Sequence, residues 1–298
     1  MNHIISWVLL IIPTFCYAQS MRNFDYLDSA SVEYCRGETR MVNYYLEQFI
    51  QKFPEDALIE EVMLRLGESY LEIKDFQPAK TKLVSVLNLK ERDRKFDQDG
   101  ALYHSNFDQM FPIYDSCFYS RCLQIVKSNY LRNIKYRACK DLSELHVNQQ
   151  QYDSSLYYLA LSEKAYLPAY GGCVNGMLME MALITNEMTE VYLLKRDTFS
   201  AINRLMSAVF YYEGNNSRKA HRTLRTLLQT RYSAAEIKNE MDRAIANSKI
   251  ITEESKPKPY FSFFEYKPKV LAWSPYNETD ESLRKWLREN PYLQELTK

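Results

Sequence analysis

The stretch EVMLRLGESYLEIKDFQPAKTKLVSVLNL, residues 61–89, decides the fold. Its apolar and small residues recur at the spacing of two amphipathic helices joined by a turn. Gly67 carries no side chain, so it predicts the point where the second helix approaches the first most closely. Ala79 allows tight packing from the opposite side, while Tyr70 and Leu83 fill the space around this contact. The stretch therefore predicts a helix–turn–helix unit with a close internal contact.

This spacing resembles the tetratricopeptide repeat, a helix–turn–helix unit of about 34 residues. The residues that match the packing positions of the repeat are Met63, Leu66, Gly67, Tyr70, Ala79 and Leu83. A single unit of this kind cannot bury its apolar face alone, so it stacks on its neighbours. The resemblance implies a right-handed helical-repeat fold in which this best unit covers residues 60–93.

Two weaker units follow the same spacing. In residues 136–168, Ser143 stands where Gly67 stands in the best unit, and His146 takes a packing position. In residues 182–213, Thr189 takes the place of the glycine. The steps of 76 and 46 residues between these three positions are unequal, so the predicted stack is irregular. The further packing positions are Cys139, Leu142, Tyr152, Ser155 and Leu159 in the second unit and Met188, Tyr192, Ala201 and Leu205 in the third.

The predicted fold class is all-α, an irregular solenoid of tetratricopeptide-like units with a non-repeat C-terminal tail. Only seven glycines in 298 residues argue against a turn-rich all-β fold. The predicted segments are a signal peptide (1–18), a helical-repeat domain (19–250), a linker or tail rich in proline and aromatic residues (251–277) and a C-terminal helix (278–298). Further helices are expected at residues 39–53, 115–134, 216–231 and 233–249, and a capping box of Ser233 and Glu236 is expected to start the last of them. A short leading helix is expected in 19–35 and an inserted loop at 91–113.

The tail has two interpretations. Its prolines block a regular helix and favour an extended path. Its aromatic side chains are too apolar to lie freely in water, so the segment either folds back onto the helices or docks onto a partner. Self-packing is favoured, because an exposed apolar tail promotes aggregation. A short helix at 278–290 is expected to close the chain, and Pro291 to end it.

The first residues predict export. Residues 4–15 form an apolar run too short to cross a bilayer comfortably, and Cys16-Tyr17-Ala18 fits a cleavage site before Gln19. The expected location is the periplasm or the outside, with no transmembrane span after cleavage. The alternative is a lipoprotein anchored through Cys16.

Composition excludes several classes of function. Lys plus Arg and Asp plus Glu number 38 each, so no net charge attracts nucleic acid, and none is expected as a partner. No cysteine lies at metal-ligand spacing from another cysteine or a histidine, and no phosphate loop, nucleophile elbow or zinc-protease motif occurs. Cleavage leaves five cysteines, of which at least one stays unpaired. We therefore expect no metal, no cofactor and no catalytic residue.

The resemblance places the first helix of each unit along a concave, partner-binding surface. The side chains aimed there are Glu61, Leu64, Glu68, Leu71 and Glu72 in the best unit and Arg137, Lys140, Glu144 and Asn148 in the second. This acidic and then basic order suits a peptide of mixed charge. The expected function is a non-catalytic protein–protein scaffold or assembly factor of the cell envelope, whose partner and oligomeric state the sequence leaves open.

Other interpretations remain. Glu68-Ser69 is similar to the start of a lytic transglycosylase motif, so an envelope hydrolase with a divergent site is one alternative. A glycan- or nutrient-binding accessory protein is another. A basic stretch is either a solvated helix face or a site for an acidic lipid, lipopolysaccharide or protein face; it comprises Arg218, Lys219, His221, Arg222, Arg225 and Arg231.

Overall fold

The computed structural model describes residues 23–56, 58–90, 119–166, 174–208, 210, 215–253, 256–268 and 279–297. Most of these residues lie in helices, which confirms the predicted all-α character. Within these ranges no helix is long and apolar enough to cross a membrane. The predicted signal peptide (1–18), the Cys16 anchor and the loop at 91–113 lie outside the described residues.

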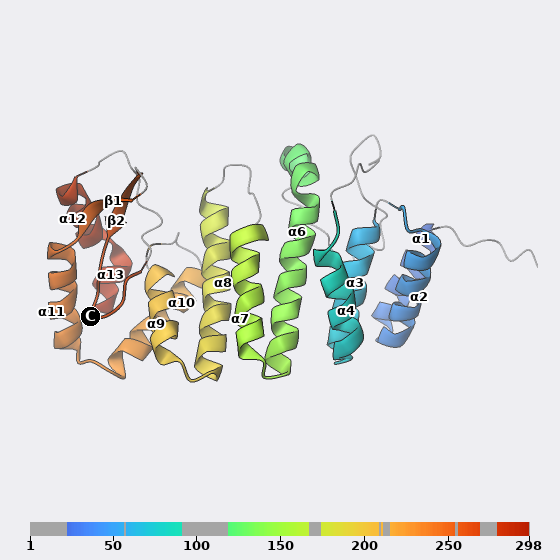
Figure 1. Cartoon of the computed structure of the whole chain (residues 1–298), viewed down its shortest axis with the longest axis horizontal. Coiled ribbons are helices and arrows are strands. Elements are labelled where there is room, and N and C mark those ends of the chain that lie inside the picture. The colour runs from blue at the N-terminus through green and yellow to red at the C-terminus, as the bar shows by residue number, and fades with distance from the viewer. Residues whose placement is uncertain are drawn as a thin grey trace, which may run out of the picture.

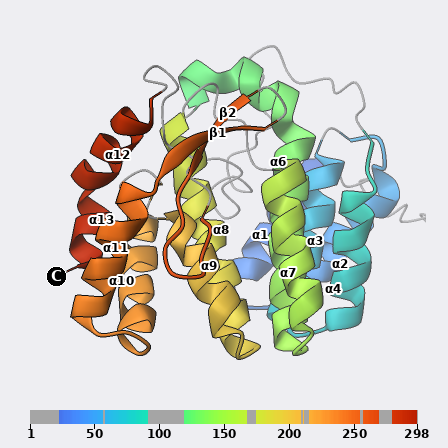
Figure 2. The ribbon, with the colours of Figure 1, turned by 60° about the vertical axis from the view of Figure 1, so that its left-hand side comes forward.

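The helices follow one another along the long axis of the molecule in sequence order, from α1 and α2 at one end to α11, α12 and α13 at the other (Figure 1). The turned view in Figure 2 shows α7 beside α6, and α9 beside α8. The elements are α1 (Asn23–Cys35), α2 (Thr39–Lys52), α3 (Ile59–Glu72), α4 (Phe76–Leu87), α6 (Tyr119–Asn148), α7 (Tyr152–Leu161), a π-helical turn (Ser162–Tyr166), α8 (Val174–Leu194), α9 (Thr198–Ala208), α10 (Asn215–Gln229), α11 (Ala234–Ala246), β1 (Lys249–Glu253), β2 (Lys256–Tyr260), α12 (Asp280–Glu289) and α13 (Pro291–Leu296).

Four helix hairpins share one turn. The pairs α1–α2, α3–α4, α6–α7 and α8–α9 each turn through a residue of positive φ, and the next N–H donates to the carbonyl five residues back. This is the Schellman pattern that ends a helix. The residues of positive φ are Gly37 (76°), Lys74 (59°), Gln150 (58°) and Arg196 (63°). The four hairpins are therefore locally equivalent, although three of them lack the usual glycine.

Two of these hairpins also pack through small residues at the same position. A Cβ atom built on Gly67 would lie 2.7 Å from Leu83 Cδ2, which confirms the predicted close approach. At the matching position of α6, the Ser143 hydroxyl is hydrogen-bonded to that of Ser155 at 2.7 Å. Small residues at this position let α4 pack closely on α3 and α7 on α6.

Replacing Gly67 with alanine is expected to lower the free energy of unfolding. Overpacking costs about 1–3 kcal/mol, which exceeds the gain of about 0.5–1 kcal/mol from replacing a helical glycine. Urea unfolding of Gly67→Ala, Leu83→Ala and the double variant measures this. The double variant should be less destabilised than the sum of the two single variants, because removing the Leu83 side chain makes room for the methyl group. Strict additivity would contradict the close contact.

The N-terminal hairpin agrees with the prediction, because α1 (Asn23–Cys35) lies in the range 19–35 where a leading helix was expected. The helix expected at 39–53 is confirmed as α2, and α1 packs against it as its first helix. Ala30 of α1 and Val42 of α2 are fully buried at the positions that correspond to Gly67 and Ala79. Both residues are small enough for the two helices to pack closely, although neither is the residue found in the best unit.

The helix α6 corrects a predicted boundary. The helix expected at 115–134 and the first helix of the second unit are one continuous helix of 30 residues. No glycine or proline occurs between Tyr119 and Asn148, so nothing in the backbone interrupts it.

The apolar core divides into two large clusters. One holds side chains from α1, α2, α3, α4 and α6, including Leu46, Phe49 and Leu64. The other holds side chains from α8 to α13 together with Phe261, Phe263 and Tyr266 from the tail. The self-packing predicted for the tail is therefore confirmed for these three residues, while residues 269–278 lie outside the described part.

The tail also forms strands that the sequence analysis did not predict. The strands β1 and β2 pair antiparallel, with Ile250 opposite Pro259 and Thr252 opposite Pro257. Two proline residues are compatible with β2 because it has a single neighbouring strand and needs few N–H donors. The expected extended path is correct, but it is a hairpin rather than a free linker.

The C-terminal end contains two helices instead of one. The helix α12 ends at Glu289, and Pro291 begins α13 rather than ending the helical region. Proline is favoured at the first position of a helix, where its missing N–H has no partner to lose. The Asn290 side chain accepts hydrogen bonds from the N–H groups of Tyr292 and Leu293, which caps α13. The predicted capping box of Ser233 and Glu236 is present at the start of α11.

Candidate functional site

The predicted groove residues do not share one open surface. Glu61, Leu64 and Leu71 are buried. Leu64 belongs to the apolar cluster formed by α1, α2, α3, α4 and α6. The prediction of Leu64 as a partner-facing side chain is thus corrected, because α3 turns that position toward its neighbouring helices. The remaining residues are partly or fully exposed: Glu68, Arg137 and Lys140 are half-buried, while Glu72, Glu144 and Asn148 are exposed.

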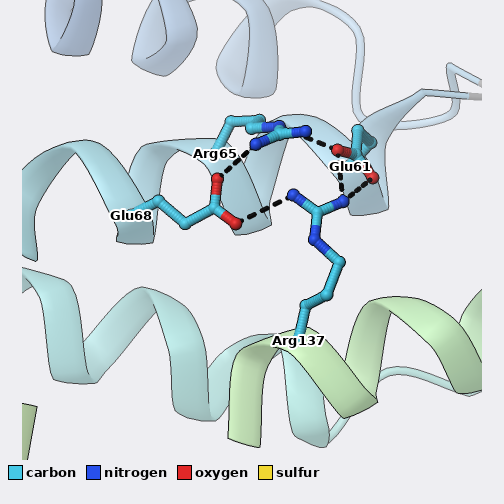
Figure 3. Close-up of polar contacts among 4 residues, drawn as sticks. All are labelled: Glu61, Arg65, Glu68 and Arg137. Carbon is cyan, nitrogen blue, oxygen red and sulfur yellow. Dashed lines mark hydrogen bonds and ion pairs between the residues drawn. The ribbon is translucent and has the colours of Figure 1, made fainter. Parts of the chain in front are cut away.

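Four charged side chains of α3 and α6 form a closed network (Figure 3). Arg65 bonds Glu61 through Nε at 2.9 Å and Glu68 through a terminal nitrogen at 2.7 Å. Arg137, from α6, reaches the same two carboxylates at 2.9 Å and 2.8 Å. Each guanidinium thus bridges both carboxylates, which fixes α3 against α6.

The network determines the charge of its members. Burial alone would raise the pKa of Glu61, but the charges of Arg137 and Arg65 outweigh it and hold that pKa below its ordinary value. Burial would lower the pKa of Arg137, yet Glu61 and Glu68 raise it above the usual range. Glu61 and Arg137 therefore stay ionised at neutral pH. Three of the side chains expected to face a peptide of mixed charge, Glu61, Glu68 and Arg137, are therefore paired within the chain.

A cavity of about 430 Å³ lies next to this network, where α6, α7 and α8 meet. It is open at the surface on the side of Leu194, whose side chain is 52% exposed. The lining combines carboxylates with aliphatic side chains; its residues are Lys140, Asp141, Ser143, Glu144, Val147, Leu159, Glu187, Glu190, Val191 and Leu194. We call this the α6–α8 groove.

The α6–α8 groove is acidic. Of its described lining residues, four carry carboxylates and one, Lys140, carries a positive charge. Lys140 pairs with Glu187 at 2.9 Å, and Lys219 of α10 pairs with Glu190 at 2.6 Å in an exposed contact. The remaining carboxylates of the groove, Asp141 and Glu144, are not neutralised by a lysine of the groove.

Two carboxylate oxygens in the groove are buried without a hydrogen-bond partner in the described part of the chain, Asp141 Oδ2 and Glu187 Oε2. Burial raises the pKa of Asp141, and the nearby charge of Glu68 raises it further. Burial likewise raises the pKa of Glu187 against the opposing effect of Lys140. Buried acceptors without donors cost stability, so a ligand that supplies donors there would be favoured.

The other reactive side chains near the groove are occupied or inert. The Ser143 hydroxyl is bonded to Ser155, and His146 donates from Nδ1 to Gln151 Oε1 at 2.6 Å while it stacks on Tyr158. Burial raises the pKa of the Cys139 thiol to about 12, so it stays protonated. Among the described residues, no group of three or more potential ligands could hold a metal ion.

Sequence reasoning identified Lys140 and Glu144 in the groove but missed its α8 side. The offset of 46 residues between Ser143 and Thr189 leads from Glu144 to Glu190. The same offset leads from Asn148 to Leu194. The α8 side of the groove could therefore have been predicted by aligning the third unit with the second and carrying the groove positions across.

The fold and the groove together define a mostly helical protein whose helix hairpins carry an acidic cavity. Comparison with protein-family models, with curated proteins and with solved structures finds no match. The function is therefore inferred from this chain's own residues.

Proposed function

We propose that this chain is a helical-repeat protein of tetratricopeptide type that binds a segment of another protein in the α6–α8 groove. The shared turn of four hairpins and the close contact at Gly67 support the repeat interpretation. The predicted signal peptide supports a role as a scaffold or assembly factor of the cell envelope, in the periplasm or outside the cell. The proposed role is non-catalytic.

The proposed partner segment is basic with apolar residues beside its charges. The observation that carries this proposal is the pair of buried, unpartnered oxygens Asp141 Oδ2 and Glu187 Oε2. A lysine or arginine supplies several donors and a positive charge in one side chain. Val147, Val191 and Leu194 offer aliphatic contacts for neighbouring residues. The sequence alone predicts a partner of mixed charge. Arg137 is paired with Glu61 and Glu68, so it does not offer its positive charge to an acidic residue of the partner, and the proposed partner is basic.

Neutralising the groove is expected to weaken this binding. Random peptides displayed on phage are selected on the wild-type protein, and the selected peptides should be enriched in Lys or Arg next to Leu or Val. The dissociation constant of a selected peptide, measured by fluorescence anisotropy, should rise at least about tenfold in the variant Asp141→Asn/Glu187→Gln. The variant should fold normally, because burial already disfavours the charged form of both side chains.

The matched control is Asp242→Asn/Glu289→Gln, which removes the same charge from exposed positions of α11 and α12. It should bind like the wild type. Peptide affinity should also fall as the pH drops from 7 toward the ordinary carboxyl pKa of about 4, since Asp141 and Glu187 take up protons above that value. An equal loss in both variants, or selection of peptides without basic residues, would contradict the proposal.

A second function is favoured by one observation. Carboxyl groups with a raised pKa in one cavity are also what a general acid of glycoside cleavage requires. Among the described residues that line the groove there is no aromatic ring and no histidine, which favours the binding role. Release of soluble fragments from labelled peptidoglycan by the wild type, abolished by Asp141→Asn or Glu187→Gln, would establish the hydrolase instead.

A further inference from the structure

A second cavity lies far from the α6–α8 groove in sequence, between α10 and the C-terminal helix α13. Its volume is about 400 Å³. The lining is mainly basic and aromatic; its residues are Arg218, His221, Arg222, Arg225, Tyr292, Glu295 and Leu296. We call this the α10–α13 pocket.

The arginines of this pocket share one face of α10. Arg218, Arg222 and Arg225 follow each other at steps of four and three residues, which places them one above the other on a helix. Like charges at this spacing repel and destabilise a helix, so the arrangement has a cost for the folded chain. Glu295 is the acidic residue of the lining, which leaves an excess of two positive charges.

Two of these arginines lack a partner in the structure. Within the described ranges, the guanidinium groups of Arg222 and Arg225 make no hydrogen bond or ion pair with another side chain. Two other arginines in this half of the chain are paired, because Arg231 bonds the Tyr266 hydroxyl at 3.1 Å and Arg243 bonds Glu240. Arg222 and Arg225 are therefore available to a ligand that enters the pocket.

The pocket wall also contains a buried histidine with an unused nitrogen. His221 is 5% exposed, and its Nε2 lies 2.9 Å from the Ala208 carbonyl oxygen. A carbonyl oxygen only accepts, so Nε2 carries the proton. Nδ1 is then an acceptor, and it is buried without a partner in the described part of the chain. The ring packs on Tyr292 with centroids 3.6 Å apart, which fixes its orientation.

We propose that the α10–α13 pocket binds a phosphate monoester group. The planar guanidinium fork matches phosphate oxygens in bidentate geometry, and Arg222 with Arg225 would provide two such forks. The second ionisation of a phosphate monoester occurs near neutrality, so the bound group can retain a hydroxyl that donates to His221 Nδ1. Either a soluble phosphorylated molecule or a lipid whose headgroup is a phosphate monoester, such as phosphatidic acid, presents this chemistry.

The test uses the full chain and two probes. Isothermal titration with glycerol 3-phosphate measures binding of a soluble monoester. Co-sedimentation with phosphatidylcholine vesicles, with and without phosphatidic acid, measures binding of a lipid headgroup. The pocket variant is Arg222→Gln/Arg225→Gln, and the control is Lys285→Gln/Arg288→Gln, which removes the same charge from exposed positions of α12. Circular dichroism checks that both variants are folded.

Binding of at least one probe by the wild type, weakened at least tenfold in the pocket variant and unchanged in the control, supports the proposal. Preference for glycerol 3-phosphate then identifies a soluble ligand, and preference for phosphatidic acid vesicles identifies a lipid. Two results overturn the proposal: no binding of either probe by the wild type, or an equal loss in both variants. The second result would mean that net charge alone attracts the probe.

Discussion

Replacing Arg137 with alanine is expected to lower the free energy of unfolding by about 3 kcal/mol, because the variant leaves a buried carboxylate with half of its compensating charge. Glu61 has a side chain that is 1% exposed, and Arg137 reaches it from the neighbouring hairpin. Because Arg65 still pairs with Glu61 in the variant, the expected loss is at the lower end of the range of about 3–5 kcal/mol for breaking a buried ion pair. Urea unfolding followed by circular dichroism measures it.

The effect of Arg137→Ala should depend on pH. The pKa of Glu61 is held below its ordinary value in the folded protein, so the stability this provides is present above the unfolded pKa and is lost as the pH falls. The difference between variant and wild type should therefore persist from pH 7 down to the ordinary carboxyl pKa of about 4, and it should shrink as the pH falls below that value. Arg36→Ala removes one partner of an exposed pair and should change stability little. A similarly small change in the free energy of unfolding for Arg137→Ala would mean that the network does not stabilise the packing of α3 against α6.

Replacing Phe263 with alanine is expected to lower the free energy of unfolding by about 3–5 kcal/mol, because the substitution leaves a cavity in a close-packed core. The Phe263 side chain is completely buried, and its backbone pairs with Tyr266 in both directions at 3.0 Å and 2.9 Å. Thermal and urea unfolding measure the loss.

The matched control for this prediction is Phe199→Ala. The Phe199 side chain is 46% exposed and contacts Tyr266 of the same segment. Its removal should cost about 1 kcal/mol or less, since surface substitutions have small effects. If Phe263→Ala lowered the free energy of unfolding as little as Phe199→Ala, the segment at 261–266 would contribute little to the stability of the helices.

The sequence was sufficient for contacts inside one hairpin. Gly67 and Leu83 are 16 residues apart, and a period of three to four residues determines which side of each helix meets the other. The same reasoning located the capping box at Ser233, where short-range hydrogen bonds determine the helix start. Such features depend on neighbouring residues along the chain, so they can be predicted from a single sequence.

The contacts between one hairpin and the next could not be predicted from the sequence. Glu61 and Arg137 were both placed on the partner-facing surface, and they occupy equivalent positions of two units. Whether such positions face a partner or each other depends on how adjacent hairpins stack, which periodicity does not determine. The α6–α8 groove was half identified for the same reason. Pro291 illustrates a local ambiguity, because proline ends one helix and begins another equally well.

The division of the apolar core has a consequence for cooperativity. The two large clusters share no residue, and α6, α7 and α8 connect them through a smaller cluster that includes Tyr136, Leu159 and Ile184. Units with separate cores can open separately, so each free energy of unfolding predicted above refers to the half of the chain that contains the substitution. A ligand bound in the α6–α8 groove would contact both sides of this junction. Its binding energy would then couple the two halves, so that occupancy of the groove makes the chain unfold as one unit.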